Sequence, residues 1–230
     1  MKTFLLSLLL LPLLSNAAFG NEEKLRKWID SSSWAEGTEY CDQKLADDLA
    51  RRPDVRSLSA DTLARLATYC AALASGKGDE AGTGWWWYTA AGLHLKTAQD
   101  LLPEMQQRGL LKTLPEPRGR AVAEEEKGKV RLLSGEVVDG APAKPLPPPR
   151  YPKYMFRLGP GVAATEVEVE LVVPRDGVPR QPLLLSAQAL PVHALFTYRF
   201  LSAWRFEPAK VNGEPVDCIY KVKVSTKRAL

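Results

Sequence analysis

A proline-rich stretch divides the chain and sets the strongest limit on its fold. Residues 141–150, APAKPLPPPR, include five prolines in ten positions. Proline fixes one backbone angle and lacks the amide donor, so neither a helix nor an inner strand can run through this stretch. We expect extended polyproline II, a semi-rigid spacer that rises about 3.1 Å per residue.

The spacing of apolar residues is helical before this stretch and strand-like after it. The sequence therefore predicts an α+β protein with two domains. An all-α domain of helical hairpins spans 21–112, a charged, proline-rich linker spans 113–150, and a mixed domain spans 151–230. Within the linker, residues 130–140 could form a short strand or hairpin.

The N-terminus predicts export. One lysine precedes an apolar run from Phe4 to Leu14, and small residues follow, which is the layout of a secretory signal peptide. This run is much shorter than the ~20 residues that cross a bilayer. We expect a signal peptide over 1–20, cleaved after Ala17, with cleavage after Ala18 or Gly20 left open. The alternative is an uncleaved membrane anchor.

Three cysteines follow, and in an oxidising compartment two of them are expected to pair. Cys41 lies on a predicted helix before a break at Pro53, and Cys70 lies on the helix after it. If the two helices form an antiparallel hairpin, the thiols meet. We predict a Cys41–Cys70 disulfide and a buried, inert thiol at Cys218.

The rest of the helical region is predicted from local signals. Ser59 or Asp61 is expected to cap the second helix, and 76–84 is expected to be a loop. Helices are predicted at 85–102 and 103–111, in an arrangement faintly similar to a tetratricopeptide array. The adjacent tryptophans Trp85, Trp86 and Trp87 point in three directions on a helix, which favours packing over ligand stacking.

The region after the prolines predicts the order β-β-α-β. Residues 165–173, TEVEVELVV, alternate between apolar and acidic side chains, which indicates a strand with one buried face. A turn at Asp176-Gly177 leads to a return strand, whose prolines favour an irregular start. A helix over 191–206 and a final strand over 216–228 follow.

Four separated motifs in this region resemble the C-terminal domain of TonB energy transducers. The resemblance covers about 80 of the 230 residues. It implies a short antiparallel sheet backed by helix, in the periplasm of a Gram-negative envelope. The matching residues are Tyr151, Pro152, Asp176, Gly177, Trp204, Arg205, Phe206, Glu207, Pro208, Ala209, Asn212, Gly213, Glu214, Pro215 and Val216.

In that family the last strand lies at a sheet edge and pairs with the TonB-box segment of outer-membrane receptors. The resemblance implies strand addition here by a protein partner, such as a TonB-dependent receptor or another envelope protein. Outward lysines would guard the edge or attract an acidic strand. The implied partner-binding residues are Asp217, Cys218, Ile219, Tyr220, Lys221, Val222 and Lys223.

The chain also departs from the family. TonB transducers have a membrane anchor and a long proline-rich spacer, whereas this sequence has a signal-like start and a short spacer. We therefore expect a periplasmic protein-binding or accessory role in TonB-dependent transport rather than direct energy transduction. The alternative is an assembly protein whose helical domain binds the partner and whose C-terminal domain forms a homodimer.

No pattern in the sequence indicates chemistry. The two histidines, His94 and His193, have no Cys, Glu or His at metal-ligand spacing, and no nucleophile-elbow, P-loop or dinucleotide motif occurs. The net charge of +4 comes from interspersed charges, which does not favour nucleic-acid binding. We expect no catalytic site, no metal and no small-molecule cofactor.

Overall fold

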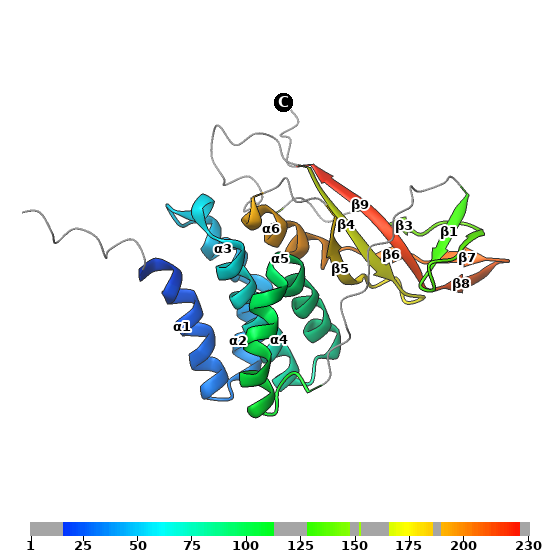
Figure 1. Ribbon diagram of the computed structural model, residues 1–230. Coiled ribbons are helices and arrows are strands. Elements are labelled where there is room, and N and C mark those ends of the chain that lie inside the picture. Colours follow the sequence, from blue (N-terminus) through cyan, green and yellow to red (C-terminus); the bar gives the residue numbers. More distant parts are fainter. Residues whose placement is uncertain (1–15, 113–127, 148–151, 153–165, 186–189, 226–230) are drawn as a thin grey trace, which may run out of the picture.

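The computed structural model describes residues 16–112, 128–147, 152, 166–185 and 190–225. The chain has the predicted α+β fold, with a group of helices beside an antiparallel sheet (Figure 1). The predicted signal peptide lies mostly outside these residues, and α1 begins at Asn16, just before the expected cleavage position.

Among the helices of the described residues, none combines the length and the apolar character that crossing a membrane requires.

The first helices follow the predicted hairpin. They are α1 (Asn16–Asp30), α2 (Trp34–Gln43), α3 (Leu45–Ala50), the 3₁₀ turn η1 (Val55–Ser57) and α4 (Ala60–Lys77). Ser59 caps α4, because its hydroxyl accepts a hydrogen bond from the Thr62 N–H at 3.1 Å. The predicted Cys41–Cys70 disulfide is confirmed, and it joins α2 to α4 with 5.8 Å between the Cα atoms.

The loop predicted over 76–84 is wrong. Only Gly78 and Asp79 separate α4 from α5 (Glu80–Gln107). Gly78 ends α4 in the left-handed conformation at φ 79°, and the Asp79 carboxylate accepts from the Gly82 N–H at 2.9 Å. Gly82 and Gly84 lie inside α5. The glycine content of the segment therefore predicted a longer loop than the structure contains.

The sequence predicted a break at Pro103, between helices over 85–102 and 103–111. The structure instead places the break within α5 at His94. His94 has extended backbone angles, φ −159° and ψ 93°, and its Nδ1 accepts from the Thr97 N–H at 3.4 Å. The imidazole thus occupies the position of a helix cap for the second half of α5. Pro103 lies within that second half.

The main sheet has five antiparallel strands in the order β2-β1-β9-β4-β5. Its long central pair is fully in register, from Glu166↔Ser225 to Val173↔Cys218. Two small pairs, β3 with β6 and β7 with β8, flank it. The strands are β1 (Lys129–Leu132), β2 (Val137–Asp139), β3 (Lys144–Pro145), β4 (Glu166–Val173), β5 (Arg180–Leu184), β6 (Phe206–Glu207), β7 (Ala209–Val211), β8 (Glu214–Val216) and β9 (Cys218–Ser225).

The described residues of the predicted linker, 128–147, take part in the sheets, and 130–140 contain the short hairpin that the sequence allowed. These residues supply β1, which pairs with β9, and β3, which pairs with β6. Ala141 and Lys210 exchange two backbone hydrogen bonds of 2.8 Å. The prolines therefore do not make this part of the chain a free spacer. A strand at a sheet edge bonds on one side only, so it tolerates prolines that lack an amide donor. The proline-containing segment can therefore pair with β6 through β3.

The helix α6 (Pro191–Leu201) connects the two halves. It contacts α3, α4 and α5 on one side and β4 on the other, and Figure 1 shows it between the helices and the sheet. The predicted helix over 191–206 is five residues too long. The Trp204 N–H donates to the Leu201 carbonyl in a tight three-residue turn, so the helix ends well before Pro208.

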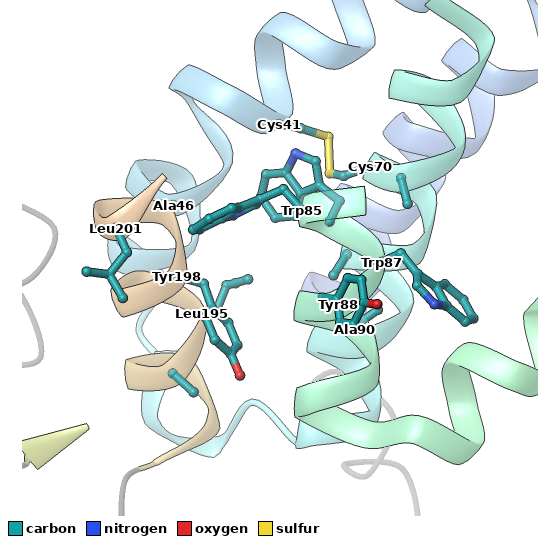
Figure 2. Close-up of a cluster of buried hydrophobic side chains, with 14 of the residues drawn as sticks. Cys41, Ala46, Cys70, Trp85, Trp87, Tyr88, Ala90, Leu195, Tyr198 and Leu201 are labelled. Carbon is teal, nitrogen blue, oxygen red and sulfur yellow. A yellow bond between two sulfur atoms is a disulfide. The ribbon is translucent and has the colours of Figure 1, made fainter. Parts of the chain in front are cut away.

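The buried side chains form one continuous cluster across both halves. Figure 2 shows part of it, with Trp85, Trp87, Tyr88 and Ala90 from α5 and Leu195, Tyr198 and Leu201 from α6 near the Cys41–Cys70 disulfide. All three adjacent tryptophans are buried, as predicted. Packing of this kind means that the described parts of the two predicted domains depend on each other.

Candidate partner-binding edge of the sheet

The strand predicted to form the binding edge has a neighbour on both sides at its beginning only. β4 borders β9 along its whole length, and β1 pairs with β9 at Cys218 and Ile219 on the other side. The prediction of an edge at 217–223 is therefore wrong where β1 covers it. The error arose because β1 comes from the segment interpreted as a linker. Its position beside β9 could not be read from the order of the strands along the chain.

The two lysines predicted to guard the edge or attract an acidic strand are paired within the sheet. Lys223 Nζ lies 2.7 Å from a Glu166 carboxylate oxygen, and Lys221 Nζ lies 3.4 Å from Glu168. The hydrogen bond from Lys223 to Glu166 raises the pKa of the lysine. The pairs connect β9 to β4 across the exposed part of the sheet, so their first role is cross-strand pairing.

Cys218 forms no disulfide and is buried, as predicted. The strand alternates between buried and more exposed positions towards its end. Cys218, Val222 and Val224 are buried, whereas Lys223 is exposed. The apolar face of β9 therefore belongs to the core, which leaves its side chains unsuited to a separate binding surface.

The tryptophan-phenylalanine motif is structural. Phe200, Trp204, Phe206 and Tyr220 form a row of ring contacts, with centroids 5.6, 6.0 and 5.1 Å apart in that order. The row runs from α6 through the chain reversal to β9. Aromatic pairs at these spacings each add about 0.5–1.5 kcal/mol beyond the burial of their surface. The motif thus fixes the helix against the sheet.

The remaining motif residues support the same corner. Arg205 Nη1 donates to the Trp204 carbonyl at 2.6 Å. Pro208 lies between β6 and β7, and Pro215 lies in β8. Pro152 is half-buried, and Tyr151 lies outside the described residues.

The Asn212-Gly213 turn joins β7 to β8. The two residues have positive φ values of 52° and 85°, which is the backbone of a type I′ hairpin turn. The turn is therefore confirmed. It closes a hairpin of its own, and Asp217 separates that hairpin from β9.

The Asp176-Gly177 turn is held against the aromatic motif. The Phe206 N–H donates to the Gly177 carbonyl at 2.9 Å, and Gly177 has a φ of 70°. A Cβ atom at this glycine would lie 2.1 Å from the Phe206 carbonyl oxygen. Only glycine allows this approach, so two motifs that are far apart in the sequence meet at one backbone contact.

One end of the five-stranded sheet is β2, which the sequence allowed as part of a short hairpin but did not indicate as a binding edge. The Gly140 N–H donates to Gly128, and the Leu132 N–H donates to Glu136. Because bonded and non-bonded pairs alternate in an antiparallel ladder, the intervening Val137 and Asp139 direct their backbone N–H and C=O groups away from β1. On that side Ala141, just beyond β2, pairs with Lys210 of β7, and among the described residues no strand pairs with Val137–Asp139 itself.

The neighbourhood of β2 is apolar and exposed. Val137 is 43% exposed and Leu133, in the preceding turn, is 50% exposed. A Lys129–Asp139 ion pair of 2.9 Å lies at the other end of the hairpin. Exposed large apolar residues beside a sheet edge are typical of surfaces that add a strand. The signal in the sequence was the Ser134-Gly135 turn between two apolar runs.

The described residues show no chemical centre beyond these features. No group of three His, Cys, Asp or Glu residues in the described part of the chain is placed to hold a metal ion. His193 is buried, and burial lowers its pKa. His94 caps a helix half, as described above, and its Nδ1 lies 2.6 Å from Thr97 Oγ1. The threonine hydroxyl is itself buried and donates to Asp61 at 2.5 Å.

This Asp61–Thr97 contact gives a prediction for pH dependence. The Thr97 hydrogen bond, with a smaller contribution from Arg65, lowers the pKa of Asp61 below its ordinary value of 3.8. A lowered carboxyl pKa stabilises the fold above that value, and the stabilisation is lost as the pH falls through the folded-state pKa. Asp61→Asn should cost roughly 0.5 kcal/mol at pH 6, because the half-exposed group is screened by solvent. The difference from the wild type should shrink at pH 3 in urea unfolding. A difference that grows towards pH 3 would contradict the assignment.

A scan against protein-family models, a search of curated proteins and a search of solved structures each return no match for this chain. The likeness to TonB C-terminal domains therefore stays a prediction from the four sequence motifs.

Proposed function

We propose that the protein is an exported protein-interaction module of the periplasm that binds an extended segment of an envelope protein by strand addition. Its partner is a segment like the TonB box, and its role is accessory to TonB-dependent transport. The motif resemblance supports the class of partner. The site differs from the one first expected, because β1 covers the beginning of β9 at Cys218 and Ile219, and the proposal places the added strand on β2.

The observation that carries this proposal is the outward backbone of Val137 and Asp139 beside exposed apolar side chains. An added strand would bond to both residues, and an alternate apolar side chain of the partner would cover Val137. The edge is short, which favours a weak and reversible complex over a permanent one. Such a complex suits a protein that meets its partner transiently.

A proline substitution tests the edge without breaking the hairpin. The Val137 N–H is not used by β1, so Val137→Pro removes only the outward donor and is compatible with an edge strand. We expect binding of peptides that carry TonB-box segments of outer-membrane receptors to fall at least roughly tenfold, the value of one net hydrogen bond plus the lost contact. Fluorescence anisotropy with labelled peptides measures this loss.

Val137→Thr is the matched control, because it keeps the N–H and the branched side chain that strands favour. It should bind almost as the wild type does. Equal binding by the proline variant and the wild type, with the sheet intact by circular dichroism, would contradict the proposal.

The alternative function, assembly through a homodimer, is tested by a different measurement. If the edge pairs two copies of the chain, sedimentation should show a dimer that Val137→Pro converts to a monomer. Separate expression of the two predicted halves is a poor test, because α6 packs against α3, α4 and α5. Cutting the chain would expose this shared core, so the full chain should be used.

A further inference from the structure

A cavity of about 790 Å³ lies where the helices meet the sheet, between the end of α4, the start of α5 and the start of β5. Its volume is within the range of about 300–1,000 Å³ that ligand sites occupy, and junctions between structural units are common places for them. It is separate from β2, which lies at the opposite end of the sheet. Neither the motifs nor the proposed strand addition gives it a role.

The backbone around the cavity is unusual. Four of its lining residues have positive φ: Gly78, Gly109, Leu111 at 51° and Gln181 at 49°. For the two side-chain-bearing residues this conformation is strained, and such strain is retained where the surrounding structure requires it, often at binding sites.

Gln181 owes its position to a bulge. Arg180 pairs with Val172 and Leu183 pairs with Glu170, so β5 has one more residue than β4 between these pairs. A bulge bends a strand and redirects a side chain. Here it brings an amide group to the cavity wall, on a strand that otherwise continues the sheet.

The charges that line the cavity are of both signs. Glu80 and Lys112 are exposed, and neither forms an ion pair with any described residue. They do not pair with each other, because no contact of 4.0 Å or less joins them. Arg180 also lines the cavity, and Asp176 holds its guanidinium at 2.6 Å. A carboxylate and an ammonium group thus face one cavity from separate positions.

A purely anionic ligand fits poorly. The Asp79 carboxylate already accepts the Gly82 N–H in the first turn of α5, and Glu80 adds a second negative charge there. These carboxylates would repel an anion at the helix N-terminus, where the helix dipole would otherwise attract it.

The cavity wall also includes Trp85, which is 7% exposed. Its indole Nε1 is buried within the protein and does not open to the cavity, so Trp85 offers the cavity apolar surface and no donor. The aromatic wall next to separated charges matches a ligand with charged ends and an apolar middle.

We propose that the cavity binds a short peptide with free ends, its carboxylate at Lys112 and Arg180, its ammonium group at Glu80 and an apolar side chain against Trp85. The volume and the presence of both charge signs in the lining are compatible with a peptide of a few residues. The site is independent of the strand addition at β2, so the two proposals succeed or fail separately.

The test uses the full chain and three probes: the tripeptide Ala-Phe-Ala, its N-acetylated form and its C-terminal amide. Calorimetry should show binding of the free peptide, and blocking either end should weaken it at least roughly tenfold, as expected for the loss of a charged hydrogen bond. Glu80→Gln should remove the preference for the free amine alone. Lys112→Met should remove the preference for the free carboxylate alone.

Lys77→Met is the matched control, because Lys77 is an exposed lysine at the end of α4 that does not line the cavity. It should leave all three affinities unchanged, as should Val137→Pro. All substituted side chains are exposed or half-exposed, so the variants should fold. No binding of the free tripeptide at millimolar concentration, or equal binding of free and blocked peptides, would overturn the proposal.

Discussion

Gly177→Ala should lower the free energy of unfolding by about 3 kcal/mol or more. A left-handed backbone costs an L-residue about 1–2 kcal/mol, and overpacking costs typically 1–3 kcal/mol more. Both apply here, since φ is 70° and the new Cβ would lie 2.1 Å from the Phe206 carbonyl oxygen. The oxygen belongs to backbone that is itself bonded to Gly177, so it cannot yield easily. The change in urea midpoint at constant slope measures the loss.

Gly213→Ala is the matched control for this substitution. Gly213 also has a positive φ, of 85°, but a Cβ there would meet nothing within 4 Å. It should cost only the strain, about 1–2 kcal/mol. The difference between the two variants isolates the contact with Phe206. Equal losses of unfolding free energy in the two variants would show that residue 177 does not contact the Phe206 backbone closely.

Removal of the disulfide is the second large effect. Cys41 and Cys70 are 29 positions apart, and closing a loop of this length restricts the unfolded chain by about 3.5 kcal/mol. The Cys41→Ala/Cys70→Ala double variant should lose about that much stability in chemical denaturation. Because the bridge ties α2 to α4, the loss should be accompanied by faster amide exchange in α1 and α2.

Cys218→Ala provides the comparison for the lost sulfur atoms. This cysteine is also buried but has no disulfide, so its substitution removes a buried sulfur atom without removing a cross-link. The double variant should lose clearly more stability than Cys218→Ala. A peptide map of the non-reduced protein should contain the 41–70 link, and a link to Cys218 instead would contradict the structure.

Local rules predicted much of the fold. The Ser59 cap, the Asn212-Gly213 turn and the Cys41–Cys70 pair each depend on a few neighbouring residues or on the geometry of one hairpin. Such features follow from backbone chemistry that does not change with the rest of the chain. The irregular start of β5, predicted from its prolines, is confirmed as a bulge at the same place.

Long-range features could not be predicted in this way. The position of β9 depends on β1, which is a four-residue strand in a proline-containing, charged segment. No local pattern states which strand β1 will join. The acidic face predicted for β4 is likewise only partly exposed, since Glu170 is 3% exposed. The sequence therefore did not reveal that β1 covers the predicted binding edge at Cys218 and Ile219.

The cavity was also beyond prediction. It is formed by a left-handed Gln181 on a bulged strand and by the junction of α4 with α5, where the sequence predicted a longer loop. Left-handed Gln and Leu residues have no sequence signal, because their conformation is imposed by packing. The shared core around α6 similarly arises from contacts between segments that the sequence assigned to different domains.

Amide exchange followed by NMR tests strand addition at β2 most directly. In the free protein the outward amides of Val137 and Asp139 should exchange quickly, whereas the Val138 amide, bonded within the hairpin, should exchange slowly. A TonB-box peptide at saturating concentration should protect Val137 and Asp139 and leave Val138 nearly unchanged. Protection confined to α1–α5, with Val137 and Asp139 still exchanging quickly, would contradict the account.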